Sequence, residues 1–261
     1  MRLEAQDIHK SFRTRRGTTQ ALDGVTFQVA SGEFVCLLGP SGCGKSTMLS
    51  IFAGLEQPDS GQVLGDGAPL TRPGSDRVVI FQEAALFPWL NVLDNVAFGL
   101  QVAGMGRKER RERAVDYLRL VHLDRFQTAY VHELSGGMKQ RAELARALAM
   151  EPKVLLMDEP FAALDAQTRD ILHIELQDIW ARSVKTILFV THNVREALVL
   201  GDRVLLMTAR PGSIKREYRF GLPRPRAMED HALVDAAREI IADLRVEVNK
   251  EREERYAQLA D

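Results

Sequence analysis

The sequence predicts an α/β fold built on a mainly parallel sheet. Apolar runs at 34–38, 154–157, 186–190 and 203–207 show no polar alternation, which is typical of strands covered on both faces. Segments with helical periodicity separate the last three runs. A glycine-rich turn and a helical pattern also follow the first run. Strands that alternate with helices in this way favour a sheet with helices packed on its faces.

The N-terminal part predicts a second, antiparallel sheet. Residues 2–10 and 18–29 alternate between apolar and polar side chains, and Gly17 marks a turn between them. Together with 61–64 they predict a small antiparallel sheet beside the glycine-rich turn. Residues 77–81 form a further apolar run, which predicts another strand.

The pattern becomes helical from about residue 91, which predicts an inserted helical subdomain over about 84–150. Asn91 is placed to cap its first helix, and Ser135 opens its third. The second helix begins with the charged run 108–113, where basic and acidic residues alternate. Alternating signs favour a solvated helix face over a nucleic-acid patch.

The remaining segments complete the predicted domain organisation. Helices are expected over 167–181 and 193–199, and residues 213–220 predict a strand that returns to the sheet edge. Pro223 and Pro225 then interrupt the chain, and a charged helix is expected over 229–259. We therefore expect one α/β core domain over 1–220 and a mostly helical C-terminal extension over 221–261.

The glycine-rich turn is a phosphate-binding loop in its required context between strand and helix. Its glycines let successive backbone N–H groups approach one phosphate, and the helix N-terminus places partial positive charge behind it. Lys45 is expected to reach the β- and γ-phosphates of a nucleoside triphosphate, and Ser46 to bind Mg²⁺. The loop comprises Gly39, Pro40, Ser41, Gly42, Cys43, Gly44, Lys45, Ser46 and Thr47.

Two acidic residues follow the apolar run 154–157. In a protein with a phosphate loop, a carboxylate at the tip of a neighbouring strand completes Mg²⁺ coordination, so Asp158 is the predicted metal ligand. Glu159 is then placed to orient or deprotonate the water that attacks the γ-phosphate. His192 follows the run 186–190 and could hydrogen-bond the γ-phosphate and that water, or have only a structural role.

Composition excludes several classes of protein. The chain has 35 basic and 36 acidic residues in 261, so bulk charge gives no reason to expect a nucleic-acid partner. No apolar run approaches the roughly 20 residues of a membrane span. Cys36 and Cys43 are the two cysteines and are expected to be unbonded. We expect a cytosolic protein that reaches any membrane through a partner.

A second predicted anion site lies at the start of the helix that Ser135 caps. Ser135 is expected to be the N-cap, and Gly136 and Gly137 allow the N–H groups of the first turn to approach an anion. With this segment, residues 134–138, the chain resembles an ATP-binding subunit of the ABC transporter superfamily. The resemblance covers residues 3 to about 220, with every motif in order, and includes Met138 in the signature segment.

The resemblance implies further roles for individual residues. Gln82 corresponds to the glutamine that senses Mg²⁺ and the γ-phosphate, and Asp165 to the aspartate of the D-loop. His192 corresponds to the switch histidine, which adds to Glu159 and Lys45 in catalysis. Phe12 falls where the family stacks an aromatic residue on adenine, and stacking needs a π face but no hydroxyl.

The family pairs two such subunits head to tail, so each ATP would lie between one phosphate loop and the partner's Ser135, Gly136, Gly137 and Met138. The partner would be a second copy or a close homologue. Two departures stand out: Met138 replaces the common Gln, a variant familiar in importers of nitrate, sulfonates and taurine, and Asn193 replaces the usual Asp. Asn caps a helix as well as Asp does, so the second change removes only a charge.

The resemblance also implies a membrane partner. The apolar segment 84–90 follows Gln82 and is expected to receive a short helix of an integral membrane permease, with Phe87 and Trp89 as anchors. A solute-binding protein would then act indirectly. The implied protein is the ATP-hydrolysing subunit of an importer of a small anion such as nitrate, a sulfonate or taurine, peripheral on the cytoplasmic side of the inner membrane.

Other readings of the same motifs remain open at this stage. The subunit could serve an exporter or a lipid-trafficking system, because those ATPases share the motifs. A soluble ABC ATPase acting on DNA or ribosomes is less favoured, since such proteins resemble fused cassettes or carry long coiled-coil insertions. A sensor without hydrolysis is expected to lack Glu159 or His192, and both are present.

Overall fold

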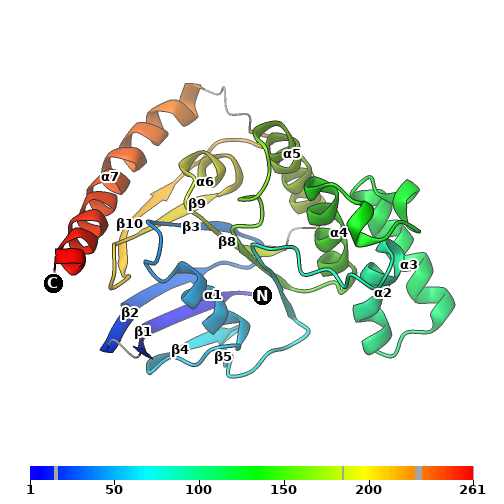
Figure 1. Cartoon of the computed structure of the whole chain (residues 1–261), viewed down its shortest axis with the longest axis horizontal. Helices are drawn as coiled ribbons and strands as arrows, with labels where there is room; N and C mark the ends of the chain where they lie inside the picture. The colour runs from blue at the N-terminus through cyan, green and yellow to red at the C-terminus, as the bar shows by residue number, and fades with distance from the viewer. Residues whose placement is uncertain (15–16, 184, 227–230, 261) are drawn as a thin grey trace. The chain divides into compact units, whose positions relative to one another are not determined.

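The structure is a computed structural model that describes residues 1–14, 17–183, 185–226 and 231–260. Its internal contacts divide the chain into two compact units. Unit 1 comprises Met1–Gly74 and Val184–Asp261, and unit 2 comprises Ser75–Ser183. Each unit is described by itself below (Figure 1).

Unit 1 contains the expected antiparallel sheet. Its strand order is β2-β1-β4-β5, formed by β1 (Leu3–Thr14), β2 (Gly17–Val29), β4 (Ser60–Gly65) and β5 (Ala68–Pro69). The inward faces of β1 and β2 place Leu3, Ile8 and Val25 in the core, where none of the three is exposed. The alternation of the sequence therefore predicted which side of these strands is buried, whereas it did not predict the two-residue β5.

Unit 1 also contains parallel strands. β3 (Phe34–Leu38) pairs in parallel with β8 (Thr186–Thr191) on one side and with β9 (Arg203–Met207) on the other. All three are buried along their whole length, as apolar runs without alternation predict. β10 (Ile214–Arg219) pairs antiparallel with β9, which confirms the expected returning edge strand.

Three helices complete unit 1. They are α1 (Lys45–Ala53), α6 (Val194–Leu200) and α7 (His231–Ala260). Figure 1 shows α7 running beside β10. The two are joined by polar contacts: Lys215 lies 2.9 Å from Glu247, and Arg216 lies 2.5 Å from Glu239. The expected C-terminal helix is therefore confirmed, although residues 229–230 of its predicted range lie outside the described residues.

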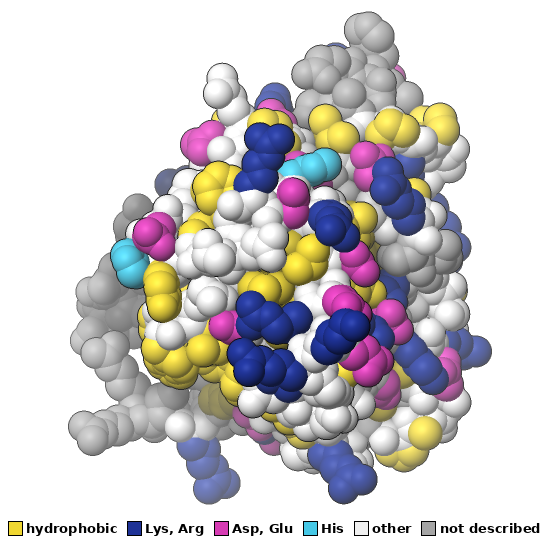
Figure 2. Space-filling view, turned by 90° about the vertical axis from the view of Figure 1, so that its right-hand side faces the viewer, with side chains coloured by type: hydrophobic (Ala, Val, Ile, Leu, Met, Phe, Trp, Pro, Cys, Tyr) yellow, Lys and Arg dark blue, Asp and Glu magenta, His cyan; other side chains and the backbone are white. Residues whose placement is uncertain are grey.

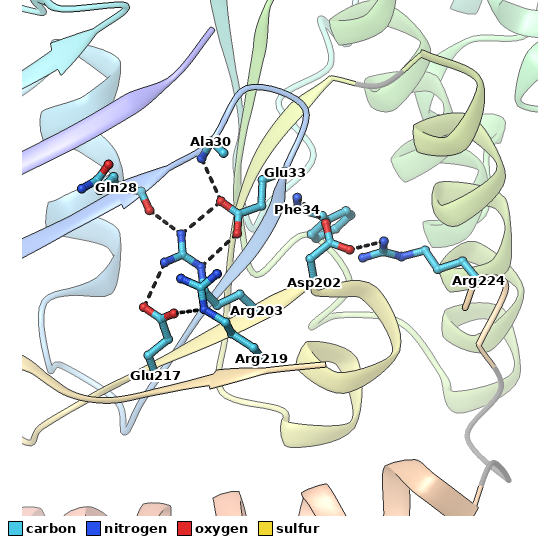
Figure 3. A network of polar contacts seen from close by, with 9 residues as sticks. All are labelled: Gln28, Ala30, Glu33, Phe34, Asp202, Arg203, Glu217, Arg219 and Arg224. Carbon is cyan, nitrogen blue, oxygen red and sulfur yellow. Dashed lines mark hydrogen bonds and ion pairs between the residues drawn. The ribbon is translucent and has the colours of Figure 1, made fainter. Parts of the chain in front are cut away.

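A buried arginine joins three strands of unit 1 and the turn that precedes β3 (Figure 3). Arg203 on β9 donates to both carboxylate oxygens of Glu33 at 3.0 Å and to Glu217 on β10 at 2.9 Å. It also donates to the backbone carbonyl of Gln28 at the end of β2. Glu33 in turn accepts the N–H of Ala30, in the turn that leads to β3. Because Arg203 is 6% exposed, these hydrogen bonds compensate the desolvation of its charge.

Unit 2 combines two strands with helices. β6 (Arg77–Ile80) pairs in parallel with β7 (Val154–Asp158). The helices α2 (Val92–Val102), α3 (Arg107–Leu120) and α4 (Gly136–Ala149) pack against one another. The unit further contains α5 (Ala166–Ser183) and two short 3-10 helices, η1 (Asp124–Phe126) and η2 (Val131–Glu133).

Local signals in the sequence explain where these helices begin. The side chain of Asn91 accepts the N–H of Asp94 at 2.7 Å, so the predicted cap of α2 is confirmed. The charged run falls on the exposed first half of α3, while Ala114 and Leu118 are fully buried. Figure 2 shows side chains of both charges interspersed on this face of the molecule. The prediction of a solvated helix face is confirmed.

The predicted fold class is confirmed by these two units, which hold an antiparallel sheet, mainly parallel strands and a group of helices between β6 and β7. No helix in the described part of the chain is long and apolar enough to cross a membrane. The predicted domain limits at 220 and at about 84–150 stay predictions.

Replacing Arg203 by Met tests how far this network stabilises the fold. The change leaves the half-buried Glu33 carboxylate without its cation, so we expect a loss of about 3 kcal/mol in the free energy of unfolding. Arg219→Gln is the matched control, because the Arg219 side chain is 74% exposed, and exposed pairs contribute about 0.5 kcal/mol. Urea unfolding of both variants measures the difference. Equal losses would contradict the role of Arg203.

Candidate functional site

The phosphate loop, residues 39–47, joins β3 to α1 in unit 1. Gly42 and Gly44 adopt positive φ angles of 70° and 98°, which L side chains disfavour. No side chain caps the N-terminus of α1. An N-terminus without a side-chain cap suits an anion, whose negative charge the helix dipole favours.

Lys45 is held inside this loop. Its ammonium donates to the carbonyl oxygens of Gly39 at 2.9 Å and Pro40 at 2.7 Å, and the residue is 5% exposed. Phosphate oxygens are stronger partners for an ammonium than neutral carbonyls are. The loop thus holds a buried cation beside exposed backbone donors, which is the chemistry that a triphosphate requires.

Both cysteines are free thiols and are buried, so the prediction that they are unbonded is confirmed. Cys43 is 1% exposed in the loop, where its sulfur lies 3.8 Å from the Lys45 ammonium. Desolvation raises the pKa of Cys43 despite the nearby charge of Lys45. A neutral, buried thiol acts here as a small space-filling side chain.

Strand register brings further predicted residues together within each unit. In unit 1, Leu38 of β3 is the register partner of Thr191 of β8, so the phosphate loop and His192 leave the same edge of the sheet. In unit 2, Ile80 of β6 is the partner of Met157 of β7. Gln82 therefore follows the end of β6, and Asp158 and Glu159 lie at the neighbouring end of β7. Carboxyl ends of parallel strands are where α/β folds bind ligands.

The two predicted acids differ in backbone geometry. Asp158 is the last residue of β7, whereas Glu159 adopts a positive φ of 44°. A non-glycine residue in this region costs free energy, and such strain concentrates at functional sites. Both residues are half-buried.

His192, Asn193 and Phe12 occupy accessible positions in unit 1. His192 is exposed, and the Asn193 side chain accepts the N–H of Arg195 at 2.9 Å as the cap of α6. Replacement of the usual Asp therefore leaves the cap intact. Phe12 on β1 is 38% exposed, with the ammonium of Lys10 5.3 Å from its ring centroid. An aromatic face there is accessible for stacking.

The signature segment, residues 134–138, forms the N-terminus of α4 in unit 2. The Ser135 hydroxyl accepts the N–H of Met138 at 3.3 Å, which confirms the predicted cap. Gly137 packs so closely on α5 that a Cβ there would lie 2.5 Å from the Thr168 methyl group. The glycine is needed for packing within unit 2, in addition to any role toward an anion.

Asp165 caps the next helix. Its carboxylate accepts the N–H of Thr168 at 3.0 Å and the Thr168 hydroxyl at 2.7 Å. These hydrogen bonds lower the pKa of Asp165. The structure therefore shows a capping role for this residue, while the D-loop role implied by the resemblance stays a prediction.

Residues that the sequence did not single out hold the segment after Gln82. On α4, Glu143 accepts the N–H of Ala85 at 3.2 Å, and Arg146 donates to the Ala85 carbonyl at 2.8 Å. Burial raises the pKa of Glu143 to about 7 against the opposing effects of the Ala85 N–H and Arg146. The second oxygen of Glu143 has no hydrogen-bond partner among the described residues. The available signal in the sequence was an acidic residue, Glu143, at a position that the helical spacing places on the buried face of α4.

The segment after Gln82 borders an apolar groove of about 410 Å³ in unit 2. Trp89 beside it is 71% exposed. The ring centroid of Phe87 lies 5.5 Å from that of Trp89 and 4.5 Å from that of Phe98. The part of segment 84–90 that packs inward is Leu86, which is 7% exposed. The groove is lined by Val78, Val79, Ala85, Phe87, Phe98, Gly99, Glu143, Arg146, Ala147 and Met150.

The donor chemistry of the predicted residues fits Mg²⁺. Ser46, Gln82 and Asp158 offer oxygen ligands, which this ion prefers. Among the described residues, no group of three or more His, Cys, Asp or Glu side chains could hold a metal ion.

Comparison with known proteins shows which family the chain resembles. The model of the ABC transporter family matches residues 22–162. The chain is 50% identical over 223 residues to the nitrate import ATP-binding protein NrtD of Synechocystis, covering 85% of this chain and 84% of that protein. It is 48% identical over 249 residues to the taurine import ATP-binding protein TauB of Burkholderia pseudomallei, covering 90% and 96%.

A solved structure shows the same fold. The chain resembles a dimeric post-hydrolysis state of the ATP-binding cassette MJ0796, bound to ADP and Pi, with a TM-score of 0.75. Sequence identity is 32%, and the match covers 86% of this chain and 99% of that one.

The raised pKa of Glu143 predicts a pH-dependent cost in stability. The folded state keeps the Glu143 proton up to about pH 7, whereas the unfolded chain releases it near pH 4.5. The folded state thus binds more protons in this window, so the free energy of unfolding falls as pH rises through it. Glu143→Gln removes the ionisation and should gain up to about 3 kcal/mol over wild type between pH 5 and pH 8.

Urea unfolding at the two pH values measures this gain. Asp116→Asn is the control, because the Asp116 side chain is 71% exposed on α3. A difference between Glu143→Gln and wild type that does not change with pH would contradict the raised pKa.

Proposed function

Because the chain belongs to the ABC transporter family, as an ATP-binding subunit that hydrolyses ATP, we propose that it drives uptake of a small anion such as nitrate, a sulfonate or taurine. The proposed substrate class rests on one observation. Over most of the chain, about half of the residues are identical to those of nitrate and taurine import subunits. An exporter or a lipid-trafficking system finds no comparable support.

In the proposed reaction, the phosphate loop binds the triphosphate through its backbone N–H groups, and Lys45 neutralises the β- and γ-phosphates. Ser46, Gln82 and Asp158 hold Mg²⁺, which when bound offsets negative charge on the transferred phosphoryl group. Glu159 orients the attacking water and accepts its proton, and His192 donates a hydrogen bond to the γ-phosphate. Phe12 stacks on adenine. These roles rest on the strand-end positions and accessibility described above.

We place the second half of each site on another subunit. The capped N-terminus of α4 offers free N–H groups of Gly136 and Gly137 to the γ-phosphate of a partner's ATP. The dimeric, ADP-bound state of the similar cassette supports this arrangement. Dimer closure around two ATP molecules and reopening after hydrolysis would supply the motion for transport, whether the partner is a second copy or a close homologue.

The apolar groove is the proposed contact with an integral membrane permease. Trp89, which is exposed, and Phe87, which is half-buried and lines the groove, are the anchors, since aromatic side chains at a pocket are typical of energetic centres in interfaces. Arg146 and Glu143 tie the groove to α4, so the same helix contacts both the docking segment and the partner's nucleotide site. The subunit would then be peripheral on the cytoplasmic side of the membrane, and a solute-binding protein would act through the permease.

Glu159→Gln tests the catalytic assignment. The amide keeps the shape but cannot accept the proton of water, so steady-state ATP hydrolysis should fall at least about 100-fold. ATP binding should persist, and size-exclusion chromatography with ATP and Mg²⁺ should show a stable dimer. Unchanged turnover would exclude Glu159 as the catalytic base.

Trp89→Ser tests the docking surface. A tagged subunit purified from detergent-solubilised membranes of its host should retain a multi-span permease, identified by mass spectrometry. The variant should lose most of that permease, because a large anchor is removed from the interface. Phe126→Ser is the control, since Phe126 is 44% exposed in the same unit but lies outside the docking segment 84–90. Equal recovery with both variants would refute the assigned surface.

A further inference from the structure

The turn between β9 and β10, residues 208–213, packs directly on the phosphate loop within unit 1. Arg210 donates from two nitrogens, Nε and Nη2, to the Gly42 carbonyl oxygen at 3.2 and 3.1 Å. Gly212 lies so close that a Cβ there would be 1.9 Å from the Cys43 carbonyl oxygen. Two successive carbonyl groups of the loop therefore face this turn.

The direction of the Gly42 carbonyl matters for phosphate binding. In a trans peptide the C=O of one residue and the N–H of the next point in opposite directions. The N–H of Cys43 therefore points away from the Arg210 guanidinium when the Gly42 carbonyl points toward it. Gly42 has a φ of 70°, and a Cβ there would lie 2.8 Å from Arg210 Nη2. The glycine thus permits both this peptide orientation and the close approach of the arginine.

The turn is itself anchored on both sides. Gly212 exchanges backbone hydrogen bonds with β2: its N–H donates to Ala21 and its carbonyl accepts from Asp23, each at 2.9 Å. Thr208 and Ser213 close the turn with a backbone hydrogen bond of 2.9 Å. The position of Arg210 relative to Gly42 is therefore defined by backbone contacts as well as by its own side chain.

The C-terminal helix reaches the same turn. Glu247 of α7 accepts the N–H of Ala209, the residue before Arg210, at 3.0 Å. Its other oxygen lies 2.9 Å from Lys215 and 3.0 Å from Lys250. Glu247 is 1% exposed. Burial by itself would raise its pKa, but these hydrogen bonds lower it, so the carboxylate stays ionised and the contact with Ala209 is charge-assisted.

We infer that Arg210 is a positioning residue of the phosphate loop and that α7 holds it there through Glu247. Arg210 orients the Gly42–Cys43 peptide so that its N–H faces bound phosphate, and Glu247 fixes the backbone from which Arg210 projects. This gives the C-terminal helix a role in nucleotide affinity. The inference rests on the proposed assignment of residues 39–47 as the phosphate loop.

Nucleotide binding to purified variants tests the inference. Arg210→Gln should lower the affinity for ADP and ATP about tenfold, in line with loss of a charge-assisted hydrogen bond. Mant-labelled nucleotides measure this affinity. Mant-AMP, which lacks the β-phosphate, should bind as it does to wild type. The KM for ATP should rise by a similar factor with a smaller change in kcat. Arg210→Lys, which keeps the charge and one donor, should recover part of the affinity.

Glu247→Leu tests the contribution of α7. Like Arg210→Gln, it should lower the affinity for ADP. The double variant should bind ADP no more weakly than Arg210→Gln alone, because both changes act on one peptide. Glu247→Gln keeps an acceptor for the Ala209 N–H and should have the smaller effect. Thermal unfolding should show that each variant is folded. Arg219→Gln, an exposed arginine on β10, should leave all affinities unchanged.

The outcomes separate the inference from the proposed site. Lys45→Ala should reduce ATP binding more strongly than any of these variants; if it does not, the phosphate-loop assignment fails and the inference fails with it. If Lys45→Ala acts as expected but Arg210→Gln leaves ADP affinity unchanged, or weakens AMP equally, the role of Arg210 is overturned. Independent, additive losses in the double variant would overturn the link to α7.

Discussion

A phosphate loop must hold several peptide N–H groups and one ammonium around a single anion, and much of unit 1 is arranged by that requirement. The peptides cannot point inward unless their carbonyl groups find partners elsewhere. The Lys45 ammonium donates to the carbonyl oxygens of Gly39 and Pro40. Arg210, in the turn between β9 and β10, donates to the carbonyl oxygen of Gly42. The glycines of the loop are needed as much for these close approaches as for their φ angles.

The register of the parallel strands positions the other predicted site residues. Because Leu38 pairs with Thr191, the loop and His192 leave their strands at one level. Because Ile80 pairs with Met157, Gln82 and the two acids do the same in unit 2. A shift of one residue in either pair would move a functional side chain to the other face of its strand. The fully buried apolar strands thus determine the positions of polar groups beyond their ends.

Helix α4 couples several features of unit 2. Its N-terminus is the signature segment, and about two and three turns later Glu143 and Arg146 bind the backbone N–H and the carbonyl oxygen of Ala85. The guanidinium of Arg146 also lies 5.5 Å from the ring centroid of Phe87. A buried carboxyl with one oxygen that has no partner among the described residues costs stability, and Glu143 carries this cost beside the groove.

The sequence by itself determined the fold class, because buried strands and helices show their periodicity along the chain. It also predicted the phosphate loop, the paired acids and the helix caps at Asn91 and Ser135, because each of these depends on residues within a few positions of one another. Tertiary structure alone decided which groups act on those motifs. Arg210 and Gly42 are separated by 168 positions, and Glu143 and Ala85 by 58. Such contacts depend on strand order and helix packing, and neither a solvent-exposed arginine in a turn nor one acid within a helix carries a local pattern that reveals its partner.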